Sequence, residues 1–176
     1  MSKEKIITER LILRKPSKDD AQNMFDNWAS DPEVTKFLTW LPHESIDVTK
    51  TIINKWLEEE NDPKTHRFII SLKSSEEAIG SIDVVNYHDD GNPEIGYCLS
   101  RKYWNKGFMT EAAGAFIDYL FNEGYKKVYI CAEINNVGSN RVIEKLGFKF
   151  THIEEREHSS SLKPEPVTLK HYVLER

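Results

Sequence analysis

The chain has 176 residues and a formal net charge of −5, from 24 Lys and Arg against 29 Asp and Glu. This length predicts a single compact domain, residues 1–176, that is large enough to bury a core. The acidic balance and the lack of a basic stripe exclude direct nucleic-acid binding from our expectations. No apolar leader and no long apolar run occur, so we expect a cytoplasmic protein without a membrane segment.

The first half of the chain alternates between strand-like and helix-like patterns. Ser17 precedes an apolar stripe at helical spacing and is a suitable N-cap. A cluster of Asp, Gly and Asn at 88–93 predicts a hairpin turn. The expected elements are a strand at 6–14, helices at 18–30 and from Ser45 to Asp62, and strands at 67–73, 78–87 and 94–100.

The second half predicts two strand–turn–helix units and a final pair of strands. A helix that opens near residue 108 ends before Gly124, and another is capped by Asn136 and ends at Gly147. Strands are expected at 127–134, 149–156 and 167–174, with a polar surface loop at 157–166. The order predicts an α/β fold with a mixed, mostly antiparallel sheet of about seven strands and helices on both faces.

Residues 104–113, WNKGFMTEAA, join the expected central strand to a helix. The first turn of a helix leaves backbone N–H groups without internal partners, and the helix dipole is positive there. Gly107 has no Cβ and would let the backbone approach a bulky ligand. The turn suits a pyrophosphate, although an ordinary strand-to-helix connection has the same pattern. Neither a P-loop nor a dinucleotide-binding glycine motif occurs.

A second segment, residues 136–148, repeats this arrangement after another strand. The two units together resemble the donor-binding half of the GNAT superfamily of acyl-CoA-dependent N-acyltransferases. The first unit is similar to that superfamily's Q/R-x-x-G-x-G/A turn, and the second to its N-x-x-[SA]…G-F segment. Trp104 and Met109 depart from the first pattern, and Met109 places a larger side chain near the turn.

The resemblance extends over the whole chain. The segments TERLILR at 8–14, DPEV at 31–34 and EIGY at 94–97 are similar to the branch that contains the ribosomal-protein N-terminal acetyltransferases. The resemblance implies acetyl-CoA as the co-substrate. The residues that it implies for donor binding are Tyr97, Cys98, Leu99, Trp104, Asn105, Lys106, Gly107, Phe108, Met109, Thr110, Asn136, Ser139 and Arg141.

Acetyl transfer to an amine needs a neutral amine, an oriented carbonyl and help for the leaving thiolate. We expect Glu94 to act as the base through a water, or else to be a solvated carboxylate at the start of its strand. Asp83 and Glu154 are weaker candidates. Ser139 would hydrogen-bond the departing sulfur, or would be only a first-turn hydroxyl. Ile143 stands where many superfamily members have a Tyr acid.

The expected function is N-acetylation of a primary amine by acetyl-CoA, with a protein N-terminal α-amine as the leading acceptor. The alternatives are a polyamine, amino acid or aminoglycoside acceptor, or a CoA-binding module without catalysis. No metal is expected, because the six His do not cluster and the two Cys lack ligand spacing. The two N-terminal helices and the 157–166 loop would form the acceptor walls, with Trp40 either in that pocket or in the core. A homodimer is left open.

Overall fold

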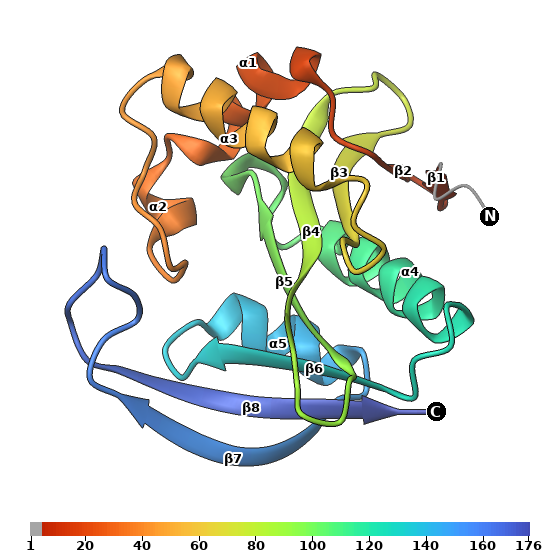
Figure 1. The fold of residues 1–176 in the computed structure, drawn as a ribbon, viewed down its shortest axis with the longest axis vertical. Helices are drawn as coiled ribbons and strands as arrows, with labels where there is room; N and C mark the ends of the chain where they lie inside the picture. Colours follow the sequence, from red (N-terminus) through yellow and green to blue (C-terminus); the bar gives the residue numbers. More distant parts are fainter. Residues whose placement is uncertain (1–4) are drawn as a thin grey trace.

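The computed structural model describes residues 5–176 and contains one eight-stranded sheet, in the order β1-β2-β3-β4-β5-β6-β8-β7 (Figure 1). The strands are β1 (Lys5–Ile7), β2 (Leu11–Arg14), β3 (Arg67–Leu72), β4 (Ala78–Tyr87), β5 (Pro93–Leu99), β6 (Lys127–Glu133), β7 (Lys149–Arg156) and β8 (Val167–Glu175). Among these strands only β5 and β6 pair in parallel. The predicted mixed, mostly antiparallel sheet is confirmed.

The expected first strand, 6–14, is wrong as a single element. It is a hairpin of β1 and β2, in which the Thr8 N–H donates to the Leu11 carbonyl at 3.0 Å. The reason is tertiary, because the turn residues Thr8 and Arg10 both bind Glu111. This hairpin accounts for the eighth strand.

The helical elements are η1 (Lys18–Asp20), α1 (Ala21–Met24), η2 (Phe25–Ala29), α2 (Pro32–Thr35), α3 (Ile46–Glu59), η3 (Arg101–Tyr103), α4 (Phe108–Asn122) and α5 (Val137–Lys145). The expected helix at 18–30 is present but irregular, with a 3₁₀ start and a wider π turn at its end. Ser17 caps it in a capping box with Asp20, as expected. The short helix α2, capped by Asp31, was not predicted.

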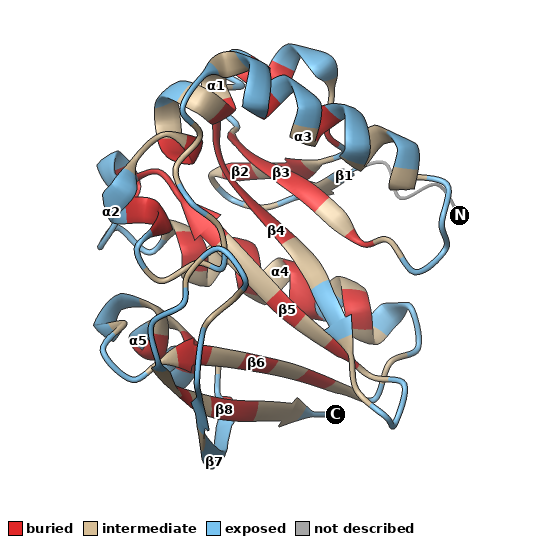
Figure 2. Cartoon of the chain, turned by 60° about the vertical axis from the view of Figure 1, so that its left-hand side comes forward, coloured by how far each residue is buried: buried red, intermediate tan, exposed pale blue. Residues whose placement is uncertain are grey.

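Two apolar clusters cover the two faces of the sheet (Figure 2). The larger cluster lies under α4 and α5 and includes Phe116, Leu120 and Ile143. The smaller cluster lies under α1 and α3 and includes Trp28 and Ile53. Helices therefore cover both faces, as the sequence predicts. No helix within residues 5–176 is long and apolar enough to span a bilayer.

Candidate functional site

The site is built around a gap between β5 and β6. The two strands pair only at Glu94 and Tyr129, and beyond this point they diverge (Figure 1). The Ser100 N–H donates to the Ile79 carbonyl at 2.7 Å. Because the backbone N–H and C=O groups of successive residues point to opposite sides of a strand, this bond fixes which residues of β5 face β4. The backbone polar groups of Tyr97 and Leu99 therefore point away from β4 and into the gap.

Trp104 binds the end of β5, at the edge of the gap. Its indole N–H donates to the Leu99 carbonyl at 2.8 Å. This bond satisfies the carbonyl that has no β6 partner and leaves the neighbouring N–H groups of the strand directed at the gap. Trp104 thus holds a strand end in place, a role that its position in the sequence did not reveal.

The turn that precedes α4 presents a run of free amides. Gly107 has φ 79° and Asn105 has φ 57°, so the backbone is left-handed at both positions. Within the described chain, the N–H groups of residues 105–110 donate to no protein acceptor. Met109 is buried in the core, so its larger side chain does not crowd these amides. Unpaired amides at the positive end of a 15-residue helix are suited to hold an anion.

The turn is clamped by the β1–β2 hairpin. Glu111 accepts hydrogen bonds from Thr8 Oγ1 at 2.6 Å, Arg10 N at 2.8 Å and Arg10 Nε at 2.7 Å. Arg10 also donates to the Lys106 carbonyl at 3.0 Å and lies over the Phe108 ring. Partial burial of Glu111 acts to raise its pKa, but these hydrogen bonds and the Arg10 charge hold the pKa below its usual value.

Asn136 and Asn140 fix the start of α5. Asn136 Oδ1 accepts from the Ser139 N–H at 3.2 Å, as expected for an N-cap. The buried Asn140 amide donates to the Glu133 and Asn136 carbonyls and accepts from the Tyr172 hydroxyl at 2.7 Å. Asn140 thereby ties α5 to β6 and β8. It was missed, because an Asn inside a helix pattern gives no sign of being buried.

Ser139 faces Tyr97 across the gap, with 3.0 Å between the two hydroxyl oxygens. Burial raises the pKa of Tyr97 to about 12, although its bond to Ser139 acts to lower it. Tyr97 therefore stays a neutral hydroxyl at physiological pH. Ile143 is fully buried in the core, so α5 supplies no phenol there, whereas β5 brings one to Ser139.

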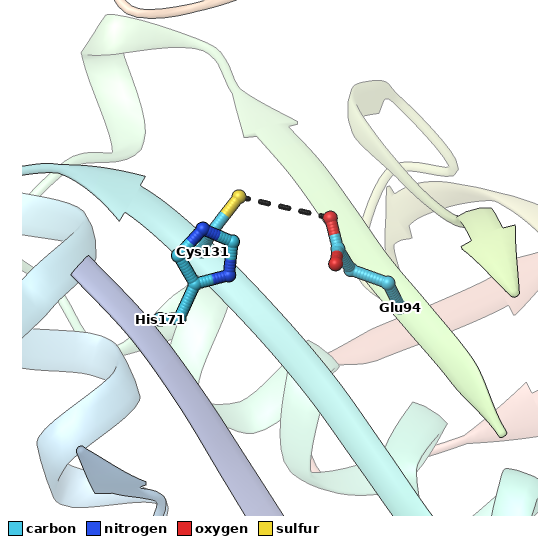
Figure 3. A group of neighbouring side chains, drawn as sticks. All are labelled: Glu94, Cys131 and His171. Atoms are coloured by element: carbon cyan, nitrogen blue, oxygen red, sulfur yellow. Dashed lines mark hydrogen bonds between the residues drawn. The ribbon is translucent and has the colours of Figure 1, made fainter. Parts of the chain in front are cut away.

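Glu94 lies at the closed end of the gap. Its Oε2 is 2.7 Å from His88 Nε2, and its Oε1 accepts from the Cys131 thiol at 3.6 Å (Figure 3). The Glu94 side chain is only 13% exposed. Burial, together with the Glu94 charge, raises the pKa of Cys131 to about 12, so the thiol keeps its proton. The leading base candidate is therefore mostly buried between two polar partners and is not a solvated carboxylate at an open strand end.

The two weaker base candidates are held in ion pairs. Asp83 lies 3.2 Å from Arg67, which also binds Glu59 of α3. Burial raises the pKa of Asp83 to about 6, against the opposing effect of Arg67. The Glu154 carboxylate binds both Arg156 and His171, and these partners lower its pKa to about 2.

Cys98 lies apart from the other donor-binding candidates. Its backbone pairs with Ser81 of β4, and its thiol is 3.2 Å from Ser81 Oγ in the cluster under α1 and α3. Burial raises the pKa of this thiol to about 11. Trp40 packs against the same cluster, and Arg141 is exposed on α5.

The loop at 157–166 contacts the segment that follows α2. Ser160 Oγ donates to the Thr39 carbonyl at 2.6 Å, and Lys163 Nζ donates to the Thr35 carbonyl at 2.6 Å. One of the segments expected to form acceptor walls, the 157–166 loop, is thus joined to α2 and to the segment after it that leads to Trp40. Lys163 acts as the C-terminal cation of α2.

The chain is similar to known acetyltransferases in sequence and in fold. A family model described as an acetyltransferase (GNAT) domain matches residues 10–149. An uncharacterized N-acetyltransferase, p20, of Bacillus licheniformis is 33% identical over 149 residues, which cover 83% of each chain. The crystal structure of a GNAT-family acetyltransferase from Bacillus anthracis matches with a TM-score of 0.82 at 26% identity, over 97% of this chain and 98% of that one.

A more distant structure shares the fold. RimL, a ribosomal L7/L12 α-N-protein acetyltransferase in complex with coenzyme A, matches with a TM-score of 0.83 at 16% identity, over 98% of both chains.

Proposed function

Because the chain belongs to the GNAT acetyltransferase family, we propose that it transfers the acetyl group of acetyl-CoA directly to the α-amine of a peptide or protein. The observation that carries this proposal is the gap between β5 and β6, with free amides at one end and Glu94 at the other. The pyrophosphate of the donor binds the amides of residues 105–110. The pantetheine arm then enters the gap beside Tyr97 and Leu99.

The acetyl carbonyl is oriented by the backbone N–H groups of β5 that face the gap. A fixed N–H directed at a developing oxyanion is worth about 2.7–4 kcal/mol in known acyl-transfer sites. Leu99 is suited to this role, because its N–H faces the gap and the Trp104 indole restrains the residue through its carbonyl. No covalent enzyme intermediate is needed, because the thioester is already activated.

Glu94 takes the proton that the amine loses, directly or through a water. Its Oε2 is held by His88, and this bond directs the carboxylate. The departing thiolate is stabilised by Ser139, whose hydroxyl is backed by the Tyr97 hydroxyl. A chain of two hydroxyls donates better than an isolated serine, because hydrogen bonds in series polarise one another.

The amine's own acidity favours an α-amine. Its pKa is about 8, against about 10.4 for a lysine side chain, so deprotonation near neutral pH costs roughly 3 kcal/mol less. The acidic groups Glu94 and Glu154 near the closed end of the gap suit any cationic acceptor. They therefore also support the second candidate, a small-molecule amine.

A panel of acceptors tests the proposal. The protein and acetyl-CoA are incubated in separate reactions with three acceptors. These are a peptide that has a free N-terminus and one internal lysine, the same peptide blocked at its N-terminus, and spermidine. We expect mass spectrometry to locate the acetyl group on the α-amine and to find none on the blocked peptide. Preferential turnover of spermidine would support the small-molecule reading. Binding of acetyl-CoA without turnover of any amine would support a non-catalytic module.

A further inference from the structure

Three side chains of different chemistry converge at the closed end of the gap. One ligand atom from each of Glu94, Cys131 and His171 lies within 4.8 Å of the other two (Figure 3). They come from β5, β6 and β8, and Cys131 and His171 are cross-strand partners. We propose that these residues form a site for one divalent transition-metal ion, Zn²⁺ foremost, and that the bound ion blocks acetyl transfer.

The ligand set and its spacing suit zinc. Thiolate, imidazole and carboxylate are the three side-chain groups that bind Zn²⁺. With Zn–S near ~2.3 Å and Zn–O near ~2.0 Å, a tetrahedral ion holds these two ligand atoms about 3.5 Å apart. Cys131 Sγ and Glu94 Oε1 are already 3.6 Å apart. Three protein ligands would leave the fourth position to a water.

The ligands are already oriented by partners outside the site. His171 Nε2 lies 2.6 Å from Glu154 Oε2, so the neutral imidazole donates its Nε2–H to the carboxylate and keeps the lone pair on Nδ1. His88 binds Glu94 Oε2 and leaves Oε1 for the ion. Zinc ligands are commonly fixed by such carboxylate–imidazole contacts, which also select the tautomer.

The local charges favour a dication. The Arg156 guanidinium binds both oxygens of Glu154, at 2.7 and 3.0 Å, and offsets one negative charge. With the imidazoles neutral, the carboxylates of Glu94 and Glu154, the Cys131 thiolate and Arg156 sum to −2, which Zn²⁺ balances. The ion displaces the thiol proton to solvent and replaces the weak S–H···O contact with two coordinate bonds.

The inhibitory part of the inference rests on the proposed function. If Glu94 is the base, an ion on its Oε1 removes the acceptor of the amine's proton. A bound ion would also occupy the space in which the amine must approach the acetyl carbon. The metal site itself needs neither acetyl-CoA nor an amine, so it is tested separately.

Cobalt titration of the full chain, without acetyl-CoA, tests the site. We expect one Co²⁺ to bind with a thiolate-to-cobalt charge-transfer absorption in the near ultraviolet, and Zn²⁺ to displace it. Cys131→Ser should abolish this band, whereas Cys98→Ser, in the opposite cluster, should retain it. Glu154→Gln should weaken binding by about 10- to 100-fold. The absence of the band in the wild type, or its persistence in a natively folded Cys131→Ser variant, would overturn the site.

Turnover separates the two proposals. With an acceptor identified from the amine panel, we expect Zn²⁺ to inhibit the wild type and a chelator to restore activity. Full activity at a Zn²⁺ concentration that saturates the site would overturn the inhibitory role. Metal binding in a protein that acetylates no amine would support the site and count against the proposed function.

Discussion

At the scale of single residues, the protein uses hydroxyl and amide groups that are fixed by specific partners. Ser139 meets Tyr97, Trp104 meets the Leu99 carbonyl, and Asn136 meets the Ser139 N–H. Each contact restrains a polar group beside the β5–β6 gap. Residue-scale predictions therefore concern the loss of one such group at a time.

Ser139→Ala should lower kcat by about 10-fold or more and leave the Kd for acetyl-CoA nearly unchanged. In the proposed mechanism the hydroxyl acts on charge that develops at sulfur in the transition state, so its loss should affect the rate more than ground-state binding. Tyr97→Phe should lower kcat by less, because Ser139 would remain. Steady-state kinetics and calorimetry on both variants check this. An unchanged kcat for Ser139→Ala would show that the Ser139 hydroxyl contributes only to the first turn of α5.

Gly107→Val should abolish measurable acetyl-CoA binding while the fold persists. Valine resists the φ of 79°, and its Cβ would lie 3.4 Å from Arg10 Nη2, which belongs to the clamp on this turn. Loss of two charge-assisted amide bonds would cost roughly 3–6 kcal/mol, or more than about a hundredfold in Kd.

Gly124→Val is the matched control for that experiment, since Gly124 also has positive φ, 104°, but lies at the other end of α4. It should unfold more easily yet bind acetyl-CoA normally. Circular dichroism and coenzyme A titration are measured on both variants. Wild-type affinity for coenzyme A in a folded Gly107→Val protein would show that this turn does not bind the pyrophosphate.

At the scale of elements, the β1–β2 hairpin and α4 act as one unit. Thr8 and Arg10 reach over 100 residues along the chain to Glu111 in the first turn of α4. The contact fixes the helix end whose amides we propose as the donor-binding groups. A helix anchored only by its buried stripe would leave this first turn free to fray.

Glu111→Gln should loosen this clamp and lower the free energy of unfolding at neutral pH by about 1–3 kcal/mol. The pKa of Glu111 is lowered in the folded protein, so its stabilising effect is complete above its unfolded pKa and is lost as pH falls through the folded pKa. The stability difference between wild type and variant should therefore shrink in acid. Urea unfolding at neutral and acidic pH measures it, and a difference that grows in acid would contradict the clamp.

At the scale of the whole molecule, the sheet holds two halves that are joined across β5 and β6 by one residue pair. Antiparallel ladders stabilise each half, and the larger apolar cluster, which includes residues of both halves, connects them, while the junction carries the gap. A ligand that occupies the gap contacts both halves and should stabilise the domain as a unit.

Acetyl-CoA should raise the unfolding free energy by about 2.7 kcal/mol at a concentration of 100 Kd, and a chelator should not reduce this effect. The reason is that, in the proposed mode of binding, the amides of residues 105–110 and the β5 edge hold the donor without an ion. Calorimetry and thermal unfolding, each with and without EDTA, provide the measurement. No binding heat and no shift at millimolar acetyl-CoA would refute donor binding.

The sequence by itself determined the fold class, the regular elements from 45 onward and the two strand–turn–helix units. These features depend on local periodicity, on caps such as Asn136 and on glycines such as Gly107, all of which are legible over a few residues. The two motifs that resemble the family, at 104–113 and 136–148, could be recognised for the same reason. The split of the first strand was not, because the hairpin depends on Glu111, far along the chain.

Only the tertiary structure decided which polar groups meet. Tyr97 and Ser139 are 42 residues apart, and Glu94, Cys131 and His171 come from three strands, so no sequence spacing relates them. The tertiary structure also shows that the Cys98 thiol lies away from the gap. Side chains alternate between the two faces of a strand, and this one points into the cluster under α1 and α3. Register and strand divergence are long-range properties. They position the chemistry of this protein, and a local pattern cannot encode them.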